Sequence, residues 1–398
     1  MTTSPTMLRL MGLAAFSSMA SMRVCDPMLV ALAQEFHVTT GDASAVIAAF
    51  AVSYGVLQLI YGPLGDRFGK VRVIIGATSA CAFFSAATAM APGLAVLVAS
   101  RAGMGAAAAG IIPLAMAWIG DQVPYAQRQE TLARLMGATV TGMMMGQWFG
   151  GVASETLGWR AAFAVLSALF LVAAVLLVRQ MRVSTIVPAQ AGCSTGPAAA
   201  FSLAAYLSAT RDLLRIPRVR WVLAVVAVEG ALAFGTVAFV PARMVNGFGL
   251  SASAAGGVMV LYGVGGLLYS LFARRWLALL GERGLALAGG TLIAVGLLLL
   301  AWAPVAAWAI AGCFLAGLGF YMLHNTLQTH ATQMAPQARG TAVTLFACLL
   351  FLGQSVGVML MAASVDRGWL APVFTAAAAG VLVLGALVAR SLRPHLHG

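Results

Sequence analysis

The sequence GPLGDRFGKVRV, residues 62–73, decides the fold, because it places four charged side chains between two long apolar runs. A charged side chain is costly inside a bilayer unless it reaches water or protein. We therefore expect this segment to leave the membrane as a short aqueous loop between two spanning helices. Its glycines allow the two helix ends to approach closely. The acidic Asp66 is placed to accept hydrogen bonds from a neighbouring helix or from a helix N-terminus.

The rest of the composition is that of an integral membrane protein. Of the 398 residues, 61% are hydrophobic and only 9% are charged, whereas soluble domains carry about 25% charged residues. Runs of at least about 18 residues without charge recur along the chain, and each is long enough to span a bilayer. Pro92 and Pro304 mark turns that divide two runs too long for one helix. With two spans that polar residues interrupt, we predict twelve transmembrane helices.

The placement of the basic residues explains the net charge of +12. Arg23 and Arg101 lie within spans, and Arg160, Arg243 and Arg367 lie in outer loops. All other lysines and arginines fall in cytoplasmic segments if both termini are inside, which follows the positive-inside rule. No nucleic-acid partner is needed. The N-terminal segment lacks the pattern of a cleavable signal, so we expect a multi-pass protein of the bacterial inner membrane with both termini cytoplasmic.

Two segments of the chain repeat. YGVLQLIY, residues 54–61, precedes the charged stretch, and YGVGGLLY, residues 262–269, precedes a second basic pair. A repeat of this kind predicts two six-helix halves. We place an N-terminal bundle at 1–182, a cytoplasmic connector at 183–217 and a C-terminal bundle at 218–398. The connector begins as a flexible linker and ends in a basic amphipathic helix that we expect on the inner leaflet.

Residues 62–73 resemble the loop motif G-x-L-x-D-R-x-G-K-x-R between the second and third helices of the major facilitator superfamily. The matching residues are Gly62, Leu64, Asp66, Arg67, Gly69, Lys70 and Arg72. The resemblance implies an all-α integral membrane protein with twelve transmembrane helices in two pseudo-symmetric six-helix bundles. It implies a monomeric secondary transporter that works by alternating access. It also implies that the motif residues control conformation by tying helix 2 to its neighbours on the cytoplasmic side.

Two further motifs support the resemblance. Arg101, in SRAGMG at 100–105, looks like the arginine of the family's fourth helix. GMMMGQWFGG, residues 142–151, is similar to the antiporter motif G-x-x-x-G-P-x-x-G-G of the fifth helix. Glycines at four-residue steps share one face and permit close helix contact. Gln147 stands where that motif has proline, and as a polar group it is a candidate to line a cavity. The motif is matched at Gly142, Gly146, Gly150 and Gly151.

Buried ionisable residues fall on four predicted helices. Arg23 and Asp26 lie in the first, Arg101 in the fourth, Glu229 in the seventh and His324 in the tenth. In the resembled family these helices line the central cavity. A buried carboxyl whose distance to an arginine changes can bind and release a proton. We assign proton coupling first to Asp26 and then to Glu229, with the two arginines as partners. A purely structural pair of Arg23 and Asp26 stays open.

Polar and aromatic side chains of the same and neighbouring helices form the expected substrate site. They are Tyr54, Gln147, Tyr262, Phe320, His324, Asn325 and Gln328. The five cysteines show no metal-ligand spacing. We therefore expect neither a metal nor another cofactor, and the proton gradient is the expected driving force.

The hypothesis carried forward is export of small hydrophobic or cationic compounds in exchange for protons, since the chain is similar to the twelve-helix drug/proton antiporter branch. A proton-coupled metabolite importer uses the same fold and stays open, as does a non-transporting membrane sensor. An enzyme is not expected, because neither HExxH nor GxSxG occurs. The expected partners are the lipid bilayer, a small-molecule substrate and protons.

Overall fold

The computed structural model of the chain describes residues 5–186, 203–335 and 338–392. Within these ranges every regular element is a helix. Nine of the described helices are long and apolar enough to cross a membrane. The expected all-α membrane fold is therefore confirmed.

The helices divide at the break between 186 and 203. The first group comprises α1 (Pro5–Arg23), the 3-10 helix η1 (Asp26–Met28), α2 (Leu29–Glu35), α3 (Thr40–Ala43), α4 (Ala45–Phe68), α5 (Lys70–Ala89), α6 (Leu94–Ala108), α7 (Ile111–Gln122), α8 (Tyr125–Thr156) and α9 (Trp159–Ile186). The second comprises α10 (Leu203–Arg215), α11 (Pro217–Glu229), the π-helix η2 (Gly230–Phe234), α12 (Gly235–Val237), α13 (Val240–Phe248), α14 (Ala252–Trp302), α15 (Ala306–Gln333), α16 (Arg339–Asp366) and α17 (Leu370–Ser391).

The nine apolar helices account for ten of the expected twelve spans. The 51-residue α14 contains two of them, because Gly281 interrupts it with a non-helical φ of 62°. Only glycine adopts such a backbone conformation without strain. The other two expected spans are α1 with its continuation through α2, and α8. Both carry charged or amide side chains that lower their hydropathy, which is why they do not count among the nine.

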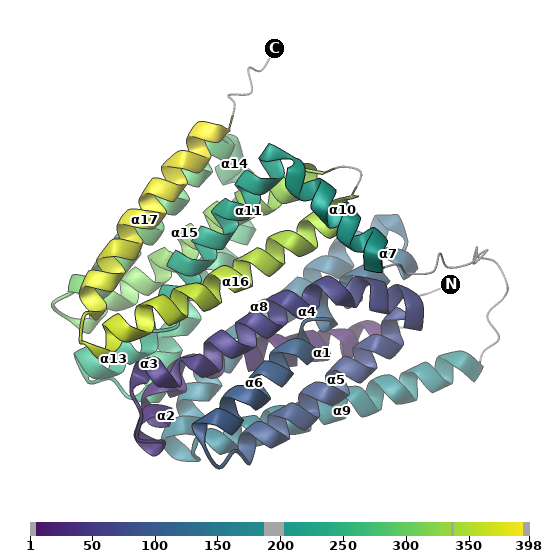
Figure 1. Cartoon of the computed structure of the whole chain (residues 1–398), viewed down its shortest axis with the longest axis horizontal. Coiled ribbons are helices and arrows are strands. Elements are labelled where there is room, and N and C mark those ends of the chain that lie inside the picture. The colour runs from purple at the N-terminus through teal and green to yellow at the C-terminus, as the bar shows by residue number, and fades with distance from the viewer. Residues whose placement is uncertain (1–4, 187–202, 336–337, 393–398) are drawn as a thin grey trace.

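Figure 1 shows α1–α9 and α11–α17 as two groups of long, roughly parallel helices. The groups meet where α8 packs on α14 and where α4 packs on α16. The two groups also resemble each other internally. In the first group α1 packs on α8, and in the second group α11 packs on α16. The C-terminal end of α17 and α10 lie toward one end of the molecule, whereas α2, α3 and α13 lie at the other.

The predicted connector is described only in part. The last helix of the first group runs to Ile186, and α10 stands where the amphipathic helix was expected. Residues 187–202, which include most of the expected flexible linker, lie outside the described residues. The boundaries at 182 and 218 and the contact of α10 with lipid stay predictions.

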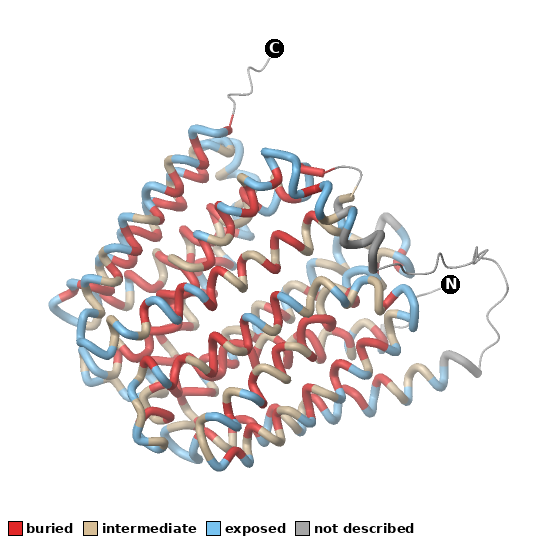
Figure 2. The backbone as a smooth tube through the Cα atoms, in the orientation of Figure 1, coloured by how far each residue is buried: buried red, intermediate tan, exposed pale blue. Residues whose placement is uncertain are grey.

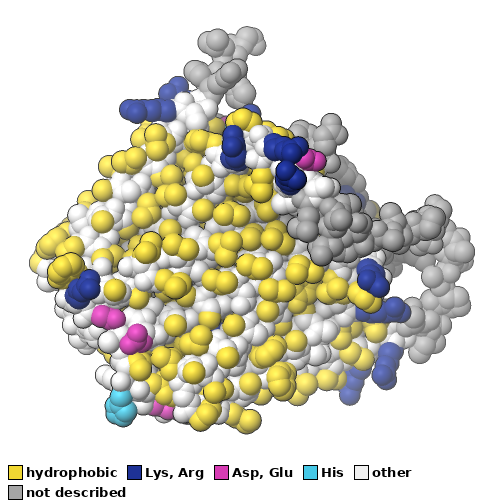
Figure 3. Space-filling model, viewed as in Figure 1, with side chains coloured by type: hydrophobic (Ala, Val, Ile, Leu, Met, Phe, Trp, Pro, Cys, Tyr) yellow, Lys and Arg dark blue, Asp and Glu magenta, His cyan; other side chains and the backbone are white. Residues whose placement is uncertain are grey.

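Burial and surface chemistry both fit a protein that is surrounded by lipid. Figure 2 shows buried residues along the inner faces of the long helices. Large apolar side chains remain exposed on the outer faces, for example Leu271 at 78% and Leu360 at 72%. On the face drawn in Figure 3, most lysines and arginines lie near the termini, and hydrophobic side chains cover the middle. Which end of the molecule faces the cytoplasm stays a prediction.

The glycines of α8 form the close contact expected of them. A Cβ added at Gly142 or Gly146 would overlap a backbone carbonyl oxygen of α1, and one at Gly150 would overlap that of Val24, just after α1 ends. A Cβ at Gly151 would overlap the first residue of α14 in the same way. The glycine face therefore brings α8 against both the first helix and the opposite half.

A matching glycine contact lies in the second half. A Cβ at Gly353 or Gly357 of α16 would overlap the carbonyl oxygens of Ala227 in α11 and Ala231 in η2. The sequence motif marks only the first of these two contacts. The pseudo-symmetry of the two halves thus extends to how closely their equivalent helices approach.

Candidate functional site

The carboxyl group of Asp26 is fully buried and bonded to two side chains. Arg23 Nη1 donates to Asp26 Oδ2 over 3.3 Å, and Gln147 Nε2 donates to the same oxygen over 3.2 Å. Among the described residues, Asp26 Oδ1 and Arg23 Nε have no hydrogen-bond partner. The expected pair of Arg23 and Asp26 is present. Gln147, expected in the substrate site, instead holds the acid.

Local sequence explains why Asp26 sits at this position. α1 ends at Arg23, and the 3-10 helix η1 starts at Asp26. Pro27 has no backbone N–H to donate, so the α-helical hydrogen-bond pattern cannot continue through it. The glycine face of α8 lets Gln147 approach from the neighbouring helix. The acid therefore lies where helix 1 changes form and where α8 is closest.

Arg101 is also buried, but it binds backbone and not a carboxylate. Its Nη1 donates to the carbonyl oxygen of Ser21 over 2.8 Å, and its Nε donates to that of Val46 over 3.4 Å. Its guanidinium lies 4.4 Å from the ring centre of Phe50. Arg101 therefore ties α6 to α1 and α4, and its charge acts on Asp26 only through space.

The second buried acid lies in the other half. Glu229 Oε2 is 2.9 Å from His324 Nδ1, and the Glu229 side chain is fully buried. Its other carboxylate oxygen has no hydrogen-bond partner among the described residues. Glu229 ends α11 and directly precedes the π-helix η2, a rare form that often marks functional sites. Both acids thus sit where their helix departs from α-helical geometry.

Aromatic rings connect the two acidic sites across the halves. The guanidinium of Arg23 lies 4.4 Å from the ring centre of Phe234 in η2. Phe234 stacks on Phe320 of α15 at 4.6 Å, and Phe320 stacks on His324 at 4.9 Å. A continuous series of contacts therefore runs from one acid to the other.

The expected substrate residues separate into two groups. Tyr262 packs near Phe320 at 6.0 Å, and its hydroxyl has no hydrogen-bond partner among the described residues. Tyr54 packs edge-on against a ring of α16 instead. Asn325 bonds the backbone of its own helix, and Gln328 is exposed. The structure thus brings Tyr262, Phe320 and His324 to the acids but leaves Tyr54, Asn325 and Gln328 outside this contact series.

Two residues of this region were not foreseen. Phe234 lies in an apolar run, where nothing in the sequence separates it from other buried aromatics. Gln354 of α16 is buried, and its side-chain oxygen has no partner within the described chain. A polar residue in an otherwise apolar span was the signal that could have identified it.

The charged stretch at 62–73 is tighter than the expected loop. Helix α4 continues to Phe68, Gly69 turns the chain with a φ of 90°, and α5 begins at Lys70. Lys70 Nζ lies 2.5 Å from Asp121 of α7 and 3.6 Å from Asp66. The side chain of Asp66 is 74% exposed. Lys70 therefore makes the tie to a neighbouring helix that was expected of Asp66, and conformational control by the motif stays a prediction.

The two halves are hydrogen-bonded at the end that carries α2 and α3. The backbone N–H of Gly41 donates to Asp366 Oδ1 over 2.7 Å, and that of Ser253 donates to Glu155 Oε2 over 3.0 Å. The hydrogen bond from Ser253 lowers the pKa of the Glu155 carboxyl. In the predicted orientation this end faces outward, so the outer ends of the two halves are joined in this conformation.

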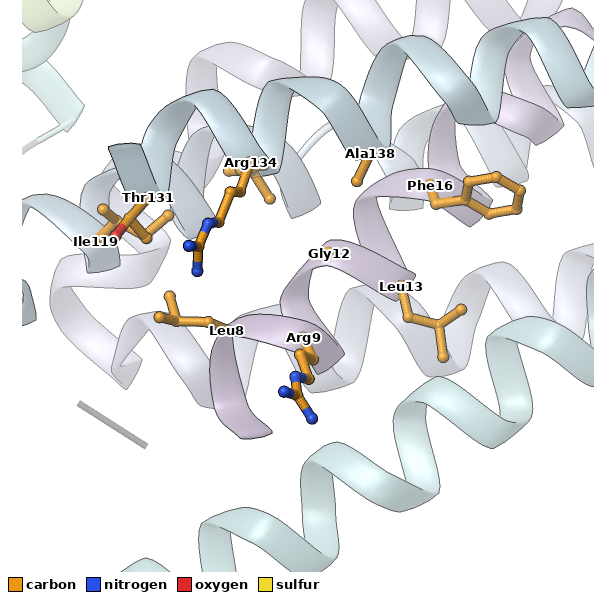
Figure 4. A pocket seen from close by; sticks show the side chains of 10 residues that line it. Leu8, Arg9, Gly12, Leu13, Phe16, Ile119, Thr131, Arg134 and Ala138 are labelled. Atoms are coloured by element: carbon orange, nitrogen blue, oxygen red, sulfur yellow. The ribbon is translucent and has the colours of Figure 1, made fainter. Parts of the chain in front are cut away.

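A pocket of about 460 Å³ lies near the opposite end of the first half. Figure 4 shows side chains of α1, α7 and α8 around it, with Phe16 at one end and the guanidinium groups of Arg9 and Arg134 toward the other. Phe16 and Arg23 lie seven residues apart, which places them on the same face of α1. The complete lining is Leu8, Arg9, Gly12, Leu13, Phe16, Ile119, Thr131, Arg134, Leu135 and Ala138.

Two repeated helical halves with buried charged side chains are typical of a membrane transporter. The sequence matches the family model of the Major Facilitator Superfamily over residues 11–358, and again over residues 246–395. The chain therefore belongs to the Major Facilitator Superfamily.

Curated relatives include two resistance proteins. The chloramphenicol resistance protein of Streptomyces lividans is 27% identical over 90% of this chain and 88% of its own length. The lincomycin resistance protein of Streptomyces lincolnensis is 32% identical, but the match covers only 39% of this chain and 33% of that protein. The uncharacterized MFS-type transporter YceJ of Bacillus subtilis is 24% identical over 84% of this chain and 83% of its own.

Solved structures share the fold at low sequence identity. The nucleoside transporter NupG matches with a TM-score of 0.77 and 13% identity, covering 97% of this chain and 99% of that one. A bacterial homolog of the human lysosomal transporter Spinster matches with a TM-score of 0.74 and 17% identity, covering 98% of this chain and 100% of its own. These likenesses extend the fold assignment to the whole chain.

Proposed function

We propose that this transporter exports small hydrophobic or cationic compounds in exchange for protons, by alternating access across the bacterial inner membrane. The observation that carries the proposal is the environment of Asp26. Its carboxyl group is fully buried and bound to a permanently charged guanidinium, and its second oxygen has no partner in the part of the chain that the structure describes. The two resistance proteins among the relatives support the substrate class.

This environment suits a group that gains and loses a proton during transport. Burial favours the protonated form of a carboxyl, whereas a nearby cation favours the ionised form. In this structure the two influences meet at one side chain, because Asp26 is buried and Arg23 lies 3.3 Å away. A small movement of Arg23 relative to Asp26 would therefore shift the balance. Rocking of the two halves provides such a movement, since Arg23 contacts Phe234 of the opposite half.

The joined outer end fits the alternating-access part of the proposal. With the halves hydrogen-bonded through Asp366 and Glu155, we expect the central residues to open toward the side that we predict to be cytoplasmic. An exporter binds its substrate from that side, whereas an importer releases its substrate there, so the flux assay below decides the direction. Phe16, on the same face of α1 as Arg23, lines a largely apolar pocket of about 460 Å³, and ligand pockets of a few hundred Å³ accept drug-sized molecules.

The test is a proton-flux assay in everted membrane vesicles that are energised by respiration. Hydrophobic cations, neutral antibiotics and small metabolites are added in turn, with vesicles lacking the protein as the control. The proposal expects at least one compound to release protons from the lumen and to accumulate there. Accumulation of a metabolite in intact cells without proton release in everted vesicles would show an importer instead. Absence of movement of every solute in both preparations would favour a non-transporting sensor.

A further inference from the structure

One side chain of the transport machinery occupies a place that a substrate could take. The guanidinium of Arg23 lies 4.4 Å from the ring centre of Phe234, within the range of a cation–π contact. That contact crosses from the first half of the molecule to the second. It coexists with a single hydrogen bond to Asp26, while Arg23 Nε and Asp26 Oδ1 remain unpartnered among the described residues.

The other contacts of Phe234 make the ring that Arg23 covers attractive to a cation. Phe234 stacks on Phe320, Phe320 stacks on His324, and His324 binds the buried carboxylate of Glu229. A negative group behind a stacked pair of rings adds to the negative potential that the ring faces already present. Tyr262 lies beside the same pair, and no described residue bonds its hydroxyl.

We propose that Phe234 is the recognition element for organic cations, and that a bound cation displaces the Arg23 guanidinium from the ring. This inference rests on the proposed function and specifies its substrate class. The displaced guanidinium turns toward Asp26, where Nε and Oδ1 can form the second hydrogen bond of a two-point ion pair. The groups that act on Asp26 are then Arg23, Gln147 and, through space, Arg101, with the thiol of Cys25 on the same turn.

The charge balance of the step is closed. Before binding, Asp26 is protonated and neutral, and Arg23 carries one positive charge on the ring of Phe234. After binding, the substrate carries the positive charge on the ring, Arg23 pairs with ionised Asp26, and one proton has left. Substrate and proton therefore exclude each other although they bind different residues. The link between them is the side chain of Arg23.

The test compares a cation with a neutral compound on purified protein in lipid nanodiscs. Tetraphenylphosphonium is the cation, and chloramphenicol is the neutral probe. Binding is measured by calorimetry, and proton release is measured in weakly buffered solution. The variants are Phe234→Leu, which removes the ring, and Phe234→Trp, which retains an aromatic face. Phe170→Leu removes another buried ring, from α9, and serves as the control.

We expect Phe234→Leu to weaken tetraphenylphosphonium binding on the order of tenfold and to abolish the proton release that it causes. Phe234→Trp and Phe170→Leu should keep both within about twofold, and chloramphenicol binding should change little in any variant. Equal weakening of both compounds by Phe234→Leu, or undiminished proton release with the cation, would overturn the inference, as would no binding of the cation to the wild type. If the wild type binds the cation but neither probe releases protons, proton exchange fails as a function, and the calorimetry alone still decides the role of Phe234.

Discussion

The two halves hold their buried acids in different ways. Asp26 pairs with a guanidinium that stays charged at every physiological pH and with a neutral amide. Glu229 pairs with an imidazole, which can lose its charge. Both acids sit at a break in the equivalent helix of their half, one a 3-10 segment and the other a π-helix. Position is thus shared between the halves, whereas the chemistry of the partner is not.

This difference separates the roles of the two acids. When Asp26 ionises, its charge is met by a fixed cation, so its state depends on how near that cation is. The partner of Glu229 is an imidazole at hydrogen-bond distance, so the two side chains can stay bonded whether or not the imidazole is charged. The first arrangement suits a proton that enters and leaves the molecule. The second suits a contact that holds α11 to α15 throughout the cycle.

The largest effect is expected for Asp26→Asn. Proton-driven transport should fall to the background of vesicles without the protein, because the amide cannot bind and release a proton. Removing one partner of a buried ion pair costs about 3–5 kcal/mol, so folding must be checked by size-exclusion chromatography. The double variant Arg23→Gln with Asp26→Asn removes both charges and is the matched control. It should recover folding without recovering transport, and transport at half the wild-type rate or more would contradict the role of Asp26.

Substitutions at the glycines of α8 and α16 test the close helix approach that the two halves share. Gly146→Val should lower stability by about 1–3 kcal/mol, because its side chain meets the backbone of α1. Gly357→Val should do the same in the other half. Gly137→Ala, in the same helix as Gly146 but with open space around it, should be neutral or slightly stabilising. Thermal melts in detergent measure all three, and a Gly146→Val melt equal to that of Gly137→Ala would show that the close contact does not matter.

Glu229→Gln should have a smaller effect than Asp26→Asn. Glutamine keeps a hydrogen-bonding oxygen for His324, so the contact between the helices is weakened but not removed; a hydrogen bond to a charged group contributes about 1.5–3 kcal/mol. We expect a slower transporter whose ratio of protons to substrate is unchanged. Parallel measurement of proton and substrate flux gives that ratio. A changed ratio would mean that Glu229 carries a transported proton.

The smallest effect concerns the outer end. Hydrogen bonding from Ser253 lowers the pKa of the Glu155 carboxyl. Ionised Glu155 therefore stabilises the contact between the halves fully above the ordinary pKa of a glutamate, about 4.3. This stabilisation is lost as the pH falls through the lowered pKa. Hydrogen exchange of the segment containing Ser253, corrected for intrinsic rates, should therefore quicken on acidification in the wild type. Glu155→Gln should show faster exchange at neutral pH and no such acid response. Identical profiles for the two proteins would remove Glu155 from the contact.

The sequence predicts the fold in detail but the site only in part. Hydropathy, charge placement and the repeat indicate twelve helices in two halves, and the spacing of Arg23 and Asp26 indicates their pairing. The contact of Glu229 with His324 joins residues that lie far apart in the chain, so no local pattern reveals it. The role of Gln147 depends on how closely α8 approaches α1. The position of the Phe234 ring depends on a π-helix, which no residue type in the sequence indicates. The partner of Lys70 lies two helices further along the chain.

The most direct test of this account is proton release on substrate binding by purified protein, measured for wild type, Asp26→Asn and Glu229→Gln with the compound that gives the strongest response in vesicles. We predict release from the wild type and from Glu229→Gln, and none from Asp26→Asn although that variant still binds the compound. Undiminished release from Asp26→Asn, or its loss only in Glu229→Gln, would contradict the assignment of the transported proton to Asp26.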